Sequence, residues 1–353
     1  MQNAIGKLVL WVCLICLTSA CQTTSHTNDS FSELEAHITK EMKARNVPGV
    51  SLAIIRDGKI VYRKAFGVQN VETGKKLTTK TVFEAASLSK PVFAYFVMQQ
   101  VQQSVLDLDR PVYEYLPNEH LVDDPRHKLI TARMLLTHTS GLPNWRSDTG
   151  GKLKLLFTPG TEFQYSGEGY EYLRQIIQHL LAVDDDGLQA RMQKEVVANI
   201  GAEFMQYTWD NTLPANKTFG HRNGKATDNT EHDKNFGAAY SLHTTPTDYA
   251  KFLLALMRPS PENKALVETF LALQTKMPHE AGEMHRSLGF PVKRSEKGIR
   301  YYHAGNSGDF RSYCHFYPIT GDGIVIFGNS DNLFSSNLAE YIVGYLGDQW
   351  FYM

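Results

Sequence analysis

The chain has 353 residues, of which 42% are hydrophobic, and its formal net charge at pH 7 is -1. A chain of this length and composition can bury a sizeable core, so a compact globular enzyme is expected rather than a disordered or repeat protein. The near-neutral charge excludes the strongly basic surface that nucleic-acid binding requires, so no nucleic-acid partner is predicted.

The first residues have the features of an export signal. Residues 8–17 are apolar throughout, a run too short to span a bilayer as a helix but typical of a signal-peptide core. Small residues then lead into Cys21, in a pattern that resembles a bacterial lipoprotein signal. We therefore expect a signal peptide over residues 1–20 and a polar tether over residues 21–29.

Two outcomes of this processing are considered. Acylation of Cys21 would anchor the protein to a membrane of the bacterial cell envelope, facing the periplasm. Cleavage by an ordinary signal peptidase near Ala20 would instead leave Cys21 unmodified. Because Cys13 and Cys16 lie within the signal, acylation would leave Cys314 as the one free thiol, and no disulfide framework is expected.

The domain is predicted to begin with a helix and a β-hairpin. Apolar residues recur at helical spacing over residues 30–45, after a capping-box pattern. Two runs with strand character, residues 50–56 and 59–66, flank the pair Asp57-Gly58, which is a strong two-residue hairpin signal.

The central part of the chain is predicted to be mostly helical. Apolar periodicity and start signals predict helices over residues 91–106, 131–136, 170–181, 187–200 and 245–257. Residues 210–236 are polar and rich in Asn, Gly, Lys and His, so a long surface loop beside the site is expected there.

The C-terminal part returns to strands. Strand character is found over residues 298–303, 310–317 and 323–327, with a turn before the last of them. A helix is predicted over residues 333–346, which would close the domain.

The order of these elements indicates an α/β (α+β) architecture for residues 30–353. Both chain ends contribute to the α/β part, which is expected to comprise about residues 30–85 and 286–353. A mostly helical part, about residues 86–285, is inserted between them.

Ser87 and Lys90 form the pattern S-x-x-K. Pro91 lies where a helix would begin, so Ser87 is expected at a helix N-terminus, where the dipole and free N–H groups favour developing negative charge. Lys90 follows one turn later on the same face and can activate the serine hydroxyl as a base. A capping serine beside a solvated lysine is the alternative interpretation.

Two further motifs lie in settings that suit chemistry. Tyr165 belongs to a Gly-rich segment before a helix and could move a proton if a nearby cation lowered its pKa, although such a tyrosine is often only packed. His303 ends a predicted strand in the pattern H-A-G and is followed by Asn306. Gly305 would let a substrate lie against the strand edge, whereas a lone histidine is more often structural.

In this order, S-x-x-K, Y-S-G and H-A-G resemble the motifs of serine β-lactamases and penicillin-binding proteins, and in particular of the class C branch. The resemblance runs from about Leu34 to the C-terminus and includes ITARMLLTHTSGLP at residues 130–143. It implies a β-lactamase/transpeptidase-like fold, in which an antiparallel sheet is flanked by N- and C-terminal helices and carries an inserted helical domain.

The resemblance also implies an acyl-enzyme mechanism. Ser87 would attack a carbonyl group, while Lys90 and Tyr165 would share the proton transfers, with either of them as the general base. The backbone N–H groups of Ser87 and Asn306 would form the oxyanion hole. His303 would lie near the substrate's carboxylate or the Tyr165 hydroxyl, and water would then release the acyl group.

Two departures from the family pattern bear on the substrate. Gly167 replaces the Asn of the middle motif, which in the family contacts the lysine and the amide of a β-lactam side chain. His303 replaces a Lys, as in D,D-peptidases and D-aminopeptidases of the family, and family VIII esterases share the fold. We therefore predict hydrolysis of an ester or a D-amino-acid amide or peptide, with β-lactam hydrolysis as the alternative.

A non-catalytic envelope protein that binds peptidoglycan peptides is the hypothesis from another functional class. Retention of Ser87, Lys90, Tyr165 and His303 together favours an enzyme, because a decayed site has no reason to keep all four. No cofactor or metal is predicted, since no H-E-x-x-H spacing occurs in the sequence. The sequence indicates no oligomeric state.

Overall fold

A computed structural model describes residues 30–209, 213–227, 235–277 and 284–350. The predicted signal peptide, the tether and Cys21 lie outside these residues. Within the described part, no helix is both long and apolar enough to cross a membrane.

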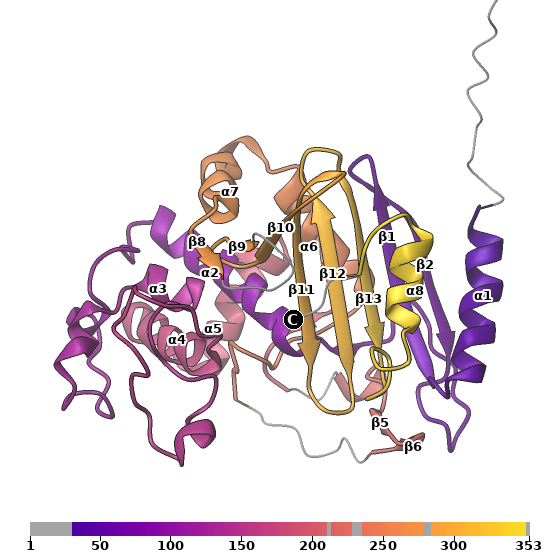
Figure 1. Cartoon of the computed structure of the whole chain (residues 1–353), viewed down its shortest axis with the longest axis horizontal. Helices are drawn as coiled ribbons and strands as arrows, with labels where there is room; N and C mark the ends of the chain where they lie inside the picture. Colours follow the sequence, from indigo (N-terminus) through magenta and orange to yellow (C-terminus); the bar gives the residue numbers. More distant parts are fainter. Residues whose placement is uncertain (1–29, 210–212, 228–234, 278–283, 351–353) are drawn as a thin grey trace, which may run out of the picture.

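In the described part of the chain, eight strands form one antiparallel sheet in the order β2-β1-β13-β12-β11-β10-β9-β8. The strands are β1 (Gly49–Arg56), β2 (Lys59–Gly67), β8 (Thr275–Met277), β9 (Met284–Arg286), β10 (Pro291–Ser295), β11 (Gly298–Asn306), β12 (Arg311–Tyr317) and β13 (Asp322–Gly328). The N-terminal hairpin joins the sheet beside the last strand, with Val50 opposite Gly328. Figure 1 shows β1 of this hairpin beside β13.

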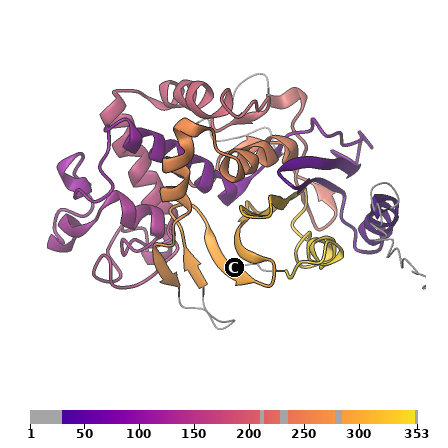
Figure 2. The ribbon, with the colours of Figure 1, turned by 90° about the horizontal axis from the view of Figure 1, so that it is seen from above.

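Helices cover both faces of the sheet. On one face, α1 (Ser30–Ala44) and α8 (Leu338–Tyr345) pack over a core that includes Leu34, Ile38 and Ile342, all with 0% exposure. On the other face, α6 (Pro246–Met257) contacts β1 and β13. The two views in Figures 1 and 2 show the sheet between these layers.

The helical part lies beside the sheet (Figure 1). Its helices are α2 (Ser89–Gln102), α3 (Ala132–Thr137), α4 (Gly167–Leu181), α5 (Asp185–Met192) with a π-helical extension (Gln193–Val197), and α7 (Lys264–Leu271). Almost every residue of α2 is buried, because this helix runs through the centre of the molecule and has no solvent face.

Short strands complete the structure away from the large sheet. A three-stranded sheet consists of β3 (Phe83–Glu84), β7 (His243–Thr244) and β4 (Met205–Gln206), and a small hairpin consists of β5 (His221–Arg222) and β6 (Lys225–Ala226). The small hairpin lies within residues 210–236, which the sequence predicted as a loop. That prediction was wrong for the hairpin, whose two-residue strands show no period in the sequence.

The strongest local signals are confirmed. The first helix and the hairpin β1-β2 occur where they were predicted, and both turn residues, Asp57 and Gly58, have positive φ angles of 50° and 72°. The last three strands and the closing helix are also present, although α8 begins only at Leu338. Helix α4 begins three residues earlier than predicted because the Ser166 hydroxyl accepts a hydrogen bond from the backbone N–H of Gly169.

The boundary of the helical part differs from the prediction. Residues 275–277 and 284–286 are strands of the large sheet. The sheet therefore includes residues that the sequence analysis assigned to the helical part, at about residues 86–285. Helix α7 and strand β10 were also not predicted. Strands β8, β9 and β10 have five residues or fewer and are defined by pairing with their neighbours, whereas α7 buries Leu266, Val267, Phe270 and Leu271 at a helical spacing that the sequence analysis missed.

Candidate active site

Ser87 lies in a 3₁₀ turn (Ala86–Leu88) that leads directly into α2. The preceding residue, Ala86, has a positive φ of 48°, which is uncommon for a residue with a side chain and is typical of strained functional turns. Ser89 stabilises the turn, because its hydroxyl donates to the carbonyl of Ala86 at 2.5 Å and accepts from the backbone N–H of Leu242 at 2.9 Å. Ser87 is therefore presented at the start of α2, as the sequence predicted.

Lys90 lies one turn after Ser87 and points toward it. The side chain is 1% exposed, and its ammonium donates to Ser87 Oγ at 3.3 Å and to the backbone carbonyl of Ala239 at 2.8 Å. The backbone N–H of Ala239 in turn donates to Glu171 Oε1 at 2.9 Å. The contacts of Ala239 thus hold the lysine amine within reach of the serine hydroxyl.

Tyr165 stands just before α4, with its ring beside the lysine. Lys90 Nζ lies 4.8 Å from the ring centroid, and the His138 ring packs against the tyrosine with centroids 4.4 Å apart. His138 Nδ1 accepts a hydrogen bond from the backbone N–H of Ser166 at 3.0 Å, which anchors the segment that carries Tyr165. The structure thus brings together the three predicted catalytic residues.

His303 lies on β11, across the cavity from Lys90. Its Nδ1 donates to the carbonyl of Ala304 at 2.8 Å, while its buried Nε2 has no hydrogen-bond partner among the described residues. Burial, with Arg286 and Lys90 nearby, lowers the pKa of His303 well below its ordinary value of 6.5. The imidazole is therefore neutral at neutral pH, with Nε2 as an acceptor.

Gly305 and Asn306 follow on the same strand and also line the cavity. A Cβ on Gly305 would lie 2.2 Å from Ser312 Oγ and 2.5 Å from the carbonyl oxygen of Ala85. Glycine is required there for close packing of β11 against the segment before the nucleophile, and not only for access of a substrate to the strand edge. Asn306 Oδ1 accepts from the backbone N–H of Gly308 at 2.9 Å.

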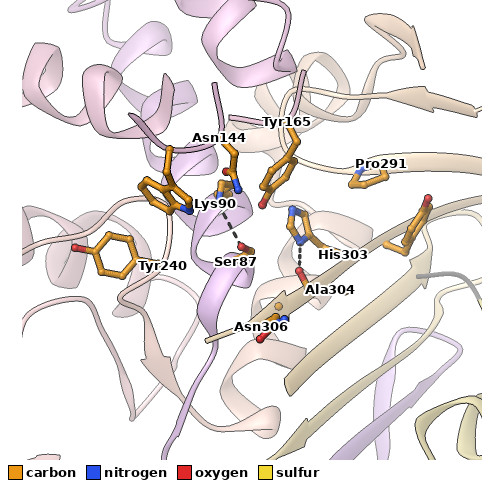
Figure 3. Close-up of a pocket in the computed structure, with 12 residues that line it drawn as sticks. Ser87, Lys90, Asn144, Tyr165, Tyr240, Pro291, His303, Ala304 and Asn306 are labelled. Atoms are coloured by element: carbon orange, nitrogen blue, oxygen red, sulfur yellow. Dashed lines mark hydrogen bonds between the residues drawn. The ribbon is translucent and has the colours of Figure 1, made fainter. Parts of the chain in front are cut away.

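These residues surround a cavity of about 420 Å³ (Figure 3). It is lined by Ser87, Lys90, Asn144, Trp145, Tyr165, Tyr240, Pro291, Tyr302, His303, Ala304, Gly305 and Asn306. Lys90 is the single charged side chain in this lining, and its amine is already held by two partners. The cavity thus presents a nucleophile, proton-transfer groups and aromatic walls.

Arg286 is a buried cation just behind the cavity. It has 0% exposure, and its guanidinium nitrogens have no hydrogen-bond partner in the described part of the chain. Its guanidinium carbon lies 5.9 Å from the centroid of the Tyr165 ring, a cation–π contact. Burial lowers the pKa of Arg286. Because Arg286 is fully covered, it adds positive potential to the site without offering a surface to a ligand.

Sequence reasoning missed Asn144, Trp145 and Tyr240 as cavity residues. Asn144 and Trp145 directly follow the HTSGLP stretch at residues 138–143, for which the sequence analysis predicted no catalytic or binding role. Trp145 packs edge-on against Tyr240 with ring centroids 5.9 Å apart. Their position directly after that stretch was the available signal, but their convergence on the cavity is a tertiary property. Within the described residues, no group of three or more His, Cys, Asp or Glu could hold a metal ion.

Proteins of known sequence resemble this chain over most of its length. Protein flp of Staphylococcus aureus strain MRSA252 is 22% identical over 336 residues, which cover 90% of this chain and 66% of that protein. The chain thus spans just under two thirds of flp. Esterase EstB of Burkholderia gladioli is 34% identical over 123 residues, which cover 35% of this chain and 31% of the esterase.

Two solved structures share the fold. The octameric penicillin-binding protein homologue from Pyrococcus abyssi has a TM-score of 0.74 at 23% identity, covering 91% of this chain and 78% of that one. D-alanine carboxypeptidase AmpC from Burkholderia cenocepacia has a TM-score of 0.73 at 22% identity, covering 90% of this chain and 99% of that one. These similarities confirm the predicted β-lactamase/transpeptidase-like fold. The Beta-lactamase family model matches residues 34–344, and because this match covers most of the chain, the protein belongs to the Beta-lactamase family.

Proposed function

We propose that this protein is a serine hydrolase that cleaves esters with an uncharged leaving group through an acyl-enzyme. The observation that carries the proposal is the contact of Lys90 with Ser87 in a cavity whose lining, among the described residues, contains no other charged side chain. A free carboxylate, as in a D-Ala-D-Ala peptide or a β-lactam, would find no available cation among the described cavity residues, because His303 is neutral and Arg286 is covered. A neutral ester avoids the free-energy cost of burying an unpaired carboxylate.

The proposed steps are those that the family resemblance implies, and the contact between Lys90 and Ser87 supports the first of them. Ser87 Oγ attacks the ester carbonyl, while its proton passes to Lys90 acting as the neutral amine, or to Tyr165 acting as the phenolate, and then to the departing alkoxide, which leaves as an alcohol. The backbone N–H groups of Ser87 and Asn306 stabilise the oxyanion. His303 Nε2, which has no hydrogen-bond partner within the described part of the chain, accepts a hydrogen bond from the Tyr165 hydroxyl or the substrate. Water then attacks the acyl-enzyme and releases the acid.

A D-amino-acid amide with an uncharged leaving group is the second candidate substrate. The same lack of a free cation admits it, whereas a peptide that ends in a carboxylate is disfavoured. The partial match to esterase EstB supports the ester as the first candidate.

The test is a substrate panel on the purified protein beside Ser87→Ala. It contains p-nitrophenyl butyrate, D-alanine p-nitroanilide, a D-Ala-D-Ala peptide and nitrocefin. We expect the butyrate to have the highest kcat/KM, and Ser87→Ala to reduce turnover to background while the thermal midpoint shifts by less than about 2 °C. If nothing turns over and a fluorophosphonate fails to label Ser87, the binding-protein hypothesis replaces this one.

We further propose that the chain is exported and anchored to a bacterial envelope membrane by acylation of Cys21. The apolar run at residues 8–17 and the small residues before Cys21 support this. Cys21→Ser should move the protein from the membrane to the soluble fraction of fractionated cells. Unchanged membrane retention of the variant would refute the anchor.

A further inference from the structure

The proposed mechanism uses two backbone N–H groups that come from different parts of the chain. Ser87 lies in the turn that leads into α2, and Asn306 is the last residue of β11. Figure 3 shows the two residues on separate segments of the ribbon. Two donors can stabilise one oxyanion together only while their relative position is fixed. The fold must therefore hold the end of β11 in place against the turn that carries Ser87.

A buried ion pair lies just before Ser87 in the chain. The backbone N–H of Thr218 donates to the carbonyl of Val82 at 3.0 Å, which brings the neighbouring Lys217 beside β3. Lys217 Nζ lies 2.9 Å from Oε1 of Glu84, three residues before Ser87, and the lysine side chain is 3% exposed. Separating the two charges would leave a buried cation without its partner, so the pair ties the segment around Lys217 to β3.

The same lysine contacts the turn that follows β11. Its Nζ lies 4.8 Å from the centroid of the Phe310 ring, a cation–π contact, and Phe310 is 1% exposed. The carbonyl of Phe310 accepts a hydrogen bond from the backbone N–H of Ser307 at 3.3 Å, which closes the turn directly after Asn306. Lys217 therefore connects the segment before Ser87 to the turn after Asn306.

The chain after Lys217 holds the outer side of this turn. A Cβ on Gly220 would lie 2.5 Å from Asp309 Cβ and 2.9 Å from a ring carbon of Phe310, so the backbone at Gly220 packs directly against the turn. Arg222 pairs with Asp309, whose Oδ1 lies 2.7 Å from Nη2 and 2.8 Å from Nε of the guanidinium. The turn is thus held by Lys217 on its buried side and by Arg222 on its exposed side.

We propose that Lys217 and Arg222 are positioning residues that hold the N–H of Asn306 at the distance from the N–H of Ser87 at which both stabilise the oxyanion. Neither side chain belongs to the lining of the cavity, so neither contacts the substrate. Lys217 acts through Glu84 and Phe310, and Arg222 acts through Asp309. This inference rests on the proposed function, because it assumes a tetrahedral adduct at Ser87.

Inhibition by propylboronic acid tests the position of these donors. The Ser87 oxygen forms a bond to boron while its proton passes to Lys90 or Tyr165, and the anionic tetrahedral adduct resembles the transition state for butyrate esters. The inhibition constant of propylboronic acid is measured beside kcat and KM for p-nitrophenyl butyrate, on the full chain and its variants.

The double variant Glu84→Gln/Lys217→Met removes both buried charges together, so that no unpaired charge is left in the interior. Its inhibition constant should rise, and its kcat should fall, by the same factor of about ten, while KM changes less than about twofold. Arg222→Ala, at a side chain that is 60% exposed, should show the same pattern with a factor of about three.

A matched control removes an ion pair of the same composition from the surface. Lys80 and Glu203 are 68% and 57% exposed, and Lys80→Met/Glu203→Gln should change none of the three constants. Arg222→Ala decides the question if the double variant at Glu84 and Lys217 does not fold, because the arginine side chain is exposed.

Two results would overturn the inference while Ser87-dependent hydrolysis stands. The folded variants could bind propylboronic acid as tightly as the unmodified protein does, or their inhibition constant and KM could rise by the same factor. In either case Lys217 and Arg222 do not position the donors for the oxyanion. If the unmodified protein hydrolyses no ester, or if Ser87→Ala retains turnover, the proposed function fails and this inference fails with it.

Discussion

At the scale of single residues, the site depends on two glycines whose missing Cβ allows close packing and on two histidines that burial keeps unprotonated. Because Gly305 has no Cβ, β11 packs closely against the segment before Ser87. Because Gly167 has no Cβ, the Trp145 indole fits beside it. His303 and His138 are buried and neutral because burial and the neighbouring cations oppose their protonation. The same residue types on an open surface would have none of these properties.

The pairing of Gly167 with Trp145 leads to a prediction about stability. Gly167→Asn should destabilise the protein by about 1–3 kcal/mol, because the new side chain overlaps the indole. Combining it with Trp145→Ala should cost less than the sum of the two single changes, because the smaller residue removes the overlap. Urea unfolding of the unmodified protein, the two single variants and the double variant measures this difference. Strictly additive losses of unfolding free energy would show that Gly167 and Trp145 do not depend on each other.

At the scale of elements, α4 supports the lysine from a distance. Glu171 on this helix accepts from the backbone N–H of Ala239, and its carboxylate also pairs with Arg174 at 2.9 Å. The carbonyl of Ala239 then holds Lys90. The helix and the segment around residue 239 therefore act as one support, although Glu171 does not touch the serine.

Glu171→Ala should lower kcat about tenfold with a smaller change in KM, because Lys90 loses its fixed position. Glu171→Gln retains the oxygen that accepts from Ala239 and should keep most of the kcat. Steady-state kinetics on p-nitrophenyl butyrate distinguishes the two variants. Equal losses of kcat in both variants would show that the charge of the carboxylate, and not its acceptor oxygen, holds Lys90 in position.

At the scale of the whole molecule, the sheet joins both chain ends and buries histidines that cannot be protonated without cost. His315 on β12 is 2% exposed and lies 3.3 Å from Asp348. Burial lowers the pKa of His315 to about 4, despite the opposing contact with Asp348. Since an unfolded histidine takes up a proton near pH 6.5, unfolding binds a proton that the folded state excludes.

The free energy of unfolding should therefore fall as the pH drops from about 6.5 towards 4. His315 alone should contribute on the order of 3 kcal/mol to this loss. Urea unfolding of the protein and of His315→Gln at several pH values isolates the contribution, since other groups, such as Glu171 with its raised pKa, titrate in both proteins. Parallel pH profiles for the two proteins would contradict the assignment.

The sequence by itself determined the features that depend on neighbouring residues. Periodicity located α1, the Asp57-Gly58 pair located the first hairpin, and Pro91 located the start of α2. Ser87 and Lys90 were predictable as a pair because they are one turn apart on the same helix start. These signals depend only on residues that are close together in the sequence, so they can be recognised without any knowledge of tertiary contacts.

Only the tertiary structure decided the features that require distant segments to converge. Strands β8 and β9 have three residues each and exist through pairing, so no sequence period revealed them. Asn144 reaches the cavity through a contact with a residue 23 positions away, and the neutrality of His303 follows from burial under several elements. Burial and the approach of remote side chains are set by packing, which is why the sequence indicated a serine nucleophile while the structure determined the shape, charge and hydrogen-bond donors of its pocket.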